Sequence, residues 1–145
     1  MPAARLALVS ATALLLAALP AQAADPQPRL IDHSNGNLID EATAKKILTE
    51  NIPAKVNKIH AFARHTFVSQ VEGGFTEGKV CVVTARVMML PLTAAMKAPL
   101  FRPLPKMTAT AFDAIPGATA EQCKAAAADK LKAATQAVVS SIVKS

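Results

Sequence analysis

The chain contains two cysteines, Cys81 and Cys123, and their positions constrain its fold more than any other feature. Cys81 lies in the apolar, valine-rich run 79–90, where alternate side chains would share one face of a β-strand. Cys123 lies on the apolar stripe of an alanine-rich helical segment. A disulfide between them would fasten that helix to a sheet, and closing a loop of about 40 residues would add roughly 3 to 4 kcal/mol in the chain-entropy model.

The N-terminus bears on this pairing because it has the pattern of a secretory signal peptide. Arg5 supplies a positive charge, residues 6–19 are apolar, and Ala21-Gln22-Ala23 is a small-residue cleavage site. The apolar run is shorter than the roughly 20 residues of a membrane span, although an uncleaved N-terminal anchor is the alternative. We therefore predict that residues 1–23 are removed and that the mature protein is periplasmic or secreted, where paired cysteines usually form a disulfide. The alternative for Cys123, beside Lys124, is a reactive thiolate.

The composition argues against nucleic-acid binding. The formal net charge is +6, but the 16 lysines and arginines are dispersed, and the chain has no Trp, no Tyr and only five Phe on which bases could stack. We interpret the charge as serving solubility, or attraction to an acidic partner or the anionic cell envelope.

The apolar periodicity predicts an α+β fold. Extended runs over 65–72, 79–90 and 107–115 indicate a small antiparallel sheet of about three to four strands. Asp40 is an N-cap for a short helix over 41–51, and a capping box formed by Thr119 and Gln122 opens a long C-terminal helix. We expect both helices in one domain, residues 39–145, with the long helix on one face of the sheet.

Two further expectations concern the ends of this domain and its middle strand. Residues 24–38 are polar and turn-rich, so we expect a flexible mature N-terminus, with a strap across the surface as the alternative. In the 79–90 strand only Thr84 and Arg86 are polar on the second face, which predicts a central strand covered on both faces.

The proline-rich segment 91–106 is the strongest candidate for function. Its four prolines exclude a regular helix or an inner strand. A stiff, extended segment with apolar residues among positive charges loses little entropy on binding. We therefore predict that it docks a partner protein; the open alternative is that its apolar residues fold onto the sheet as a lid. The predicted partner-binding residues are Leu100, Phe101, Arg102, Leu104 and Lys106.

Catalytic patterns are weaker. Glu72, Glu77 and Asp113 could cluster at one end of the sheet and act as an acid and base pair, as in glycosidases. A small envelope hydrolase using these carboxylates or a histidine is therefore the second hypothesis. The adjacent residues Asp32, His33 and Ser34 have the types of a hydrolase triad, but neighbouring residues cannot converge as a triad requires.

Metal and cofactor sites are not expected. His60 and His65 are five residues apart, a spacing that places them on one face of neither a helix nor a strand. Four methionines offer soft ligands for copper(I), but methionine more often fills gaps in a core. These are Met88, Met89, Met96 and Met107.

The sequences GKVC at 78–81 and AEQCKAAAADKLKAA at 120–134 resemble the C-terminal periplasmic domain of the Tol envelope energy transducers. In that family a strand cysteine pairs with one that opens an alanine-rich helix. The resemblance covers only the surroundings of Cys81 and Cys123, the spacing between them is longer here, and the family's membrane anchor, helical stalk and closing strand have no counterpart. It implies a similar architecture and no function.

These patterns together predict a non-catalytic exported binding protein, such as an inhibitor, an immunity-type protein or an envelope accessory protein. We expect it to dock another protein of the envelope or exterior through the segment 91–106 and the neighbouring hairpin 72–79. A third hypothesis is a membrane-surface or lipid-binding protein that uses the same apolar segment.

Overall fold

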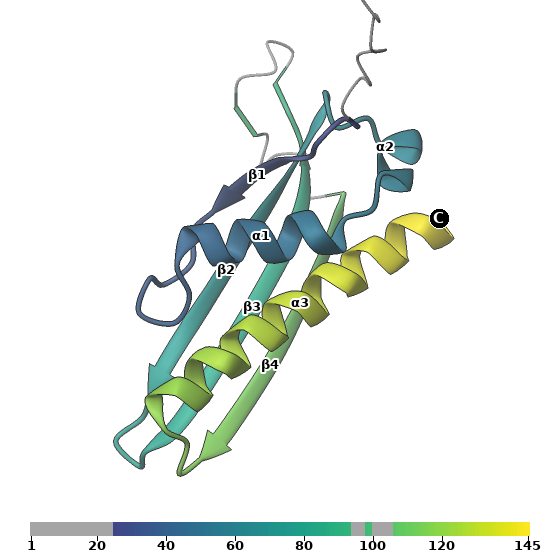
Figure 1. Cartoon of the computed structure of the whole chain (residues 1–145). Coiled ribbons are helices and arrows are strands. Elements are labelled where there is room, and N and C mark those ends of the chain that lie inside the picture. The colour runs from purple at the N-terminus through teal and green to yellow at the C-terminus, as the bar shows by residue number, and fades with distance from the viewer. Residues whose placement is uncertain (1–24, 94–97, 100–105) are drawn as a thin grey trace, which may run out of the picture.

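The computed structural model describes residues 25–93, 98–99 and 106–145. One sheet, ordered β1-β2-β3-β4, has α1 and α3 across the same face (Figure 1). This is the predicted α+β architecture, and the three long strands are antiparallel as expected. In chain order the elements are β1 (Arg29–Asp32), α1 (Glu41–Asn51), α2 (Lys55–Ile59), β2 (His65–Phe75), β3 (Val80–Pro91), β4 (Met107–Pro116) and α3 (Ala120–Lys144).

The fourth strand, β1, was not predicted. It pairs in parallel with residues 66–69 of β2, so the sheet is mixed, and this part of the expected flexible N-terminus is a strand. Polar side chains fasten it: Asp32 Oδ1 accepts hydrogen bonds from the hydroxyls of Ser34 and Ser69, each at 2.6 Å. The polar residues that suggested flexibility therefore serve strand pairing.

The core lies between the sheet and the two helices. On β3, alternate side chains from Cys81 to Met89 point toward α3 and are fully buried. Small residues on the buried face of α3 let this helix lie close to the strands. Its buried residues are Cys123, Ala126, Ala127, Leu131, Ala134, Thr135, Val138 and Ile142.

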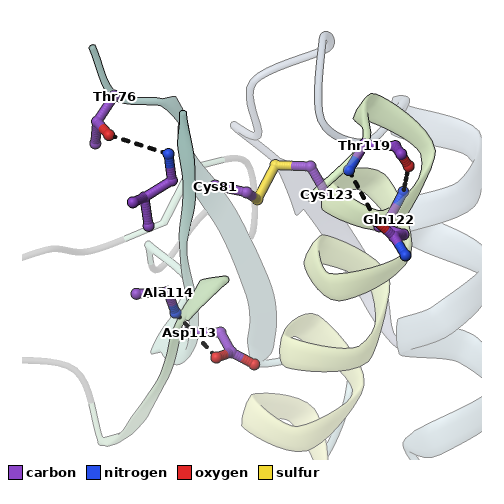
Figure 2. Close-up of a disulfide and its surroundings, with 8 residues drawn as sticks. Thr76, Cys81, Asp113, Ala114, Thr119, Gln122 and Cys123 are labelled. Atoms are coloured by element: carbon purple, nitrogen blue, oxygen red, sulfur yellow. Dashed lines mark hydrogen bonds between the residues drawn. A yellow bond between two sulfur atoms is a disulfide. The ribbon is translucent and has the colours of Figure 1, made fainter. Parts of the chain in front are cut away.

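Cys81 and Cys123 form the predicted disulfide, with their Cα atoms 5.7 Å apart. The bond joins the start of β3 to the first turn of α3 (Figure 2). The predicted capping box fixes that turn, because Thr119 and Gln122 each accept a hydrogen bond from the other's backbone N–H. Both sulfurs are committed, which excludes the reactive thiolate, and a disulfide indicates an oxidising, non-cytoplasmic location.

Strand β2 extends three residues beyond its expected end at Glu72, and glycine makes this possible. Gly73 has φ +132°, and a Cβ added there would lie 1.9 Å from the carbonyl oxygen of Val82 on β3. Only glycine allows the two backbones to approach so closely at this point. Gly74 has φ +146° but faces open space.

Candidate functional site

The structure describes only one of the five predicted partner-binding residues. Leu100, Phe101, Arg102 and Leu104 lie outside the described residues. Lys106 is exposed at the foot of β4, and its backbone N–H donates to the carbonyl of Met89 at 3.1 Å.

The ends of the proline-rich segment are held together by the sheet. Met89 of β3 pairs with Met107 of β4, so a turn of about two to five residues would suffice to join these strands. The chain instead inserts residues 92–106, whereas β2 and β3 are joined by residues 76–79 alone. The hairpin 72–79 lies at the opposite end of the sheet, where Phe75 pairs with Cys81, so the expectation that it neighbours the insertion is wrong. Near the start of the insertion, Leu92 bridges to Pro99, and the Thr93 N–H donates to the carbonyl of Ala98 at 2.8 Å. The insertion is therefore far longer than the fold requires.

Three groups that can carry positive charge meet beside the foot of this insertion. The rings of His60 and His65 contact edge to face with centroids 5.1 Å apart, although their spacing in the sequence did not predict a shared face. Burial lowers the pKa of His60, and the charges of His65 and Lys106 lower it further. Ile59, at the end of α2, leaves 47% of its surface exposed next to them. We call His60, His65 and Lys106 the basic corner.

The face of the sheet opposite α1 and α3 is open over much of its length. At the end nearest the insertion, Thr66, Val68 and Leu90 on this face are buried, but toward the other end Glu72 and Arg86 are exposed. The expectation that β3 is covered on both faces is therefore wrong for this part of the strand, although β3 is central as predicted. We call the open part the helix-free face: Gln70, Glu72, Gly74, Val80, Val82, Thr84, Arg86, Met88, Thr108, Thr110, Phe112 and Ala114.

Two of the three carboxylates considered for an acid and base pair, Glu72 and Asp113, do not meet. Glu72 lies on the helix-free face, and Asp113 lies on the opposite face, where Lys130 Nζ of α3 is 2.8 Å from its carboxylate. The hydrogen bond from Lys130 lowers the pKa of Asp113. Glu77 lies in the turn between β2 and β3. An acid and base pair made of Glu72 and Asp113 is thus wrong, and Asp113 ties β4 to α3.

The other residues considered for chemistry also have structural surroundings. His33 contributes its backbone N–H, which donates to the carbonyl of Ser69 at 2.9 Å, beside the Asp32 hydrogen bonds that fasten β1. Met88 and Met89 point to opposite faces of the sheet, and Met96 lies outside the described residues. No three or more potential metal ligands gather in the part of the chain that the structure describes.

Two adjoining surface depressions lie near the disulfide, and the sequence did not predict them. Their volumes are about 370 and 330 Å³, and they share Leu38 and Lys124 as lining residues. One also borders Phe75, which is 48% exposed, and the edge of β2 at Gly73 and Gly74. The Gly73-Gly74 pair could have indicated this depression, because two successive glycines leave the edge of β2 without side chains.

Among the described residues no helix is both long and apolar enough to cross a membrane. No protein-family model matches the chain, and no curated protein and no solved structure matches it significantly.

Proposed function

We propose that this chain is an exported, non-catalytic binding protein that docks a partner protein through the insertion 92–106. The observation that carries the proposal is the pairing of Met89 with Met107, because it leaves the insertion with no necessary role in joining β3 to β4. Long segments that a fold does not need for connection are commonly retained for binding.

The chemistry of the insertion and of its surroundings favours an acidic partner. Leu100, Phe101 and Leu104 offer apolar contacts, prolines stiffen the chain around them, and Arg102 adds positive charge. Lys106 of the basic corner adds positive charge at the foot of the insertion, whereas the lowered pKa of His60 favours its uncharged form. Complementary charge would then speed the encounter and fix the orientation of a partner with a negative surface.

Export is part of this proposal. The disulfide and the signal-peptide pattern of residues 1–23 support a periplasmic or secreted location. The expected mature N-terminus is Ala24, which mass measurement of the protein purified from its own envelope or medium will check. A native mass that still includes residues 1–23 would contradict it.

The insertion also suits a second function, attachment to an anionic membrane surface. Exposed Ile59 next to the basic corner favours this alternative, because an apolar side chain lies there beside groups that can carry positive charge. Flotation with anionic vesicles that is lost at high salt would support it, and no flotation at low salt would reject it.

The test of partner docking compares two phenylalanines. We expect Phe101→Asp to abolish a complex captured from the native cell envelope without lowering the melting temperature. Phe75→Asp is the matched control, because Phe75 is exposed at the other end of β2. Retention of the complex by Phe101→Asp, or its loss only with Phe75→Asp, would reject the insertion as the docking site.

A further inference from the structure

We propose that the helix-free face binds a second copy of this chain about a two-fold axis. This inference does not rest on the proposed function, because it uses the sheet face rather than the insertion. The face carries apolar side chains that no helix covers: Val82 and Met88 are half-buried on it, and Phe112 leaves 61% of its surface exposed.

The charges on this face are self-complementary. It carries one acidic side chain, Glu72, and one basic side chain, Arg86, both exposed. Glu72 accepts a hydrogen bond from its neighbour Gln70, whereas Arg86 has no ion pair with any described residue. A two-fold interface places the same patch on both sides, so it requires a patch that holds both charges.

The strand register shows that a two-fold axis can pair these charges. Glu72, Thr84 and Phe112 form one row across the sheet, and Gln70, Arg86 and Thr110 form the next row on the same face. Consider a two-fold axis that runs across the strands, midway between these two rows. It stacks the row with Glu72 of each copy on the row with Arg86 of the other copy. Arg86 of each copy then lies one strand away from Glu72 of the other.

Distances between packed sheets allow these pairs to close. Two sheets stack about 10 Å apart and neighbouring strands are about 4.8 Å apart, a gap that an extended arginine and an extended glutamate bridge. Two ion pairs result, one for each copy. The same axis brings the two Phe112 rings about 7 Å apart along the strands, near the separation at which aromatic rings attract each other.

The area available suits a weak dimer. Residues 80–88 of β3 extend about 30 Å and three strands are about 14 Å wide, which gives about 400 Å² of flat area per copy. Two copies would bury about 800 to 1,000 Å², less than stable specific interfaces bury and within the range of weak, transient ones. We therefore expect a dimer whose population rises with concentration.

Sedimentation equilibrium of the mature protein, residues 24–145, at concentrations up to about 1 mM tests this inference. We expect a monomer–dimer equilibrium that Arg86→Glu or Glu72→Arg each weakens by about tenfold or more, because each change sets like charges against each other. An equimolar mixture of the two variants should restore association as a heterodimer, and the E72R/R86E double variant should dimerise as the original chain does.

Three results would overturn the inference. They are a monomer at every concentration, a dimer that neither single variant weakens, and weakened variants that do not associate when mixed. Because Arg86 and Glu72 are exposed, their variants should keep the original melting temperature. Phe101→Asp should leave dimerisation unchanged, so failure of the dimer and failure of partner docking are separate outcomes.

Discussion

Reduction of the disulfide should remove a large share of the stability of this fold. Cys81 and Cys123 are 42 residues apart, and in the chain-entropy model a loop of that length contributes about 4 kcal/mol. At about 3 to 5 °C per kcal/mol for a domain of this size, the melting temperature should fall by about 12 to 20 °C. Both sulfurs are buried, so the reagent acts through transient opening and full reduction has to be confirmed by alkylation.

The matched control is a variant in which both cysteines are alanine. Thermal unfolding followed by circular dichroism should show that reductant lowers the melting temperature of the original chain and leaves that of the Cys81→Ala, Cys123→Ala variant unchanged. The variant itself should melt near the reduced chain. The reasoning is wrong if the fully reduced original chain melts within about 3 °C of the oxidised one, less than 1 kcal/mol.

Three further predictions concern stability. Asp113→Asn should lower the melting temperature at neutral pH, because it removes the charge that Lys130 contacts. Since Lys130 lowers the pKa of Asp113 below its ordinary value of 3.8, the difference between the two chains should vanish as the pH falls through that lowered pKa. A constant difference in melting temperature down to pH 2 would contradict this. Thr119→Ala should cost about 1 kcal/mol in urea unfolding by removing the cap of α3, and no loss would contradict the capping box. Gly73→Ala should destabilise by more than about 3 kcal/mol and Gly74→Ala by less, because a Cβ meets Val82 only at position 73; equal losses would be the contrary result.

The sequence predicted the elements whose patterns are local. The helix over 41–51 follows from the Asp40 cap, and the start of α3 follows from the capping box at Thr119. The disulfide followed from export and from the faces on which the two cysteines lie. In each case a short stretch of chain determines the structure, so no distant contact had to be known.

The predictions that were wrong or lacking concern contacts between residues that are far apart in the sequence. Strand β1 was missed because its pairing with β2 is held by Asp32 and Ser69, which are 37 residues apart. The open face of β3 was missed because apolar residues occur on both faces of this strand. That pattern does not show whether helices cover one face of the sheet or both. Glu72 and Asp113 were considered as a possible pair because the register that separates them onto opposite faces was unknown.

The same limit applies to the candidate site. The proline-rich composition predicted the docking segment, but the argument that it is dispensable for connecting strands needed the Met89 to Met107 pairing. The contact between His60 and His65 arises because the chain turns between α2 and β2, which the residue spacing alone did not show.

Site-specific photo-crosslinking in the native envelope tests the docking role of the insertion most directly. A photoreactive side chain would be placed at position 101, and at position 136 on the exposed side of α3 as the control. We predict a discrete crosslinked partner from position 101 and none from position 136. Absence of an adduct from position 101, or the same adduct from both positions, would contradict the account.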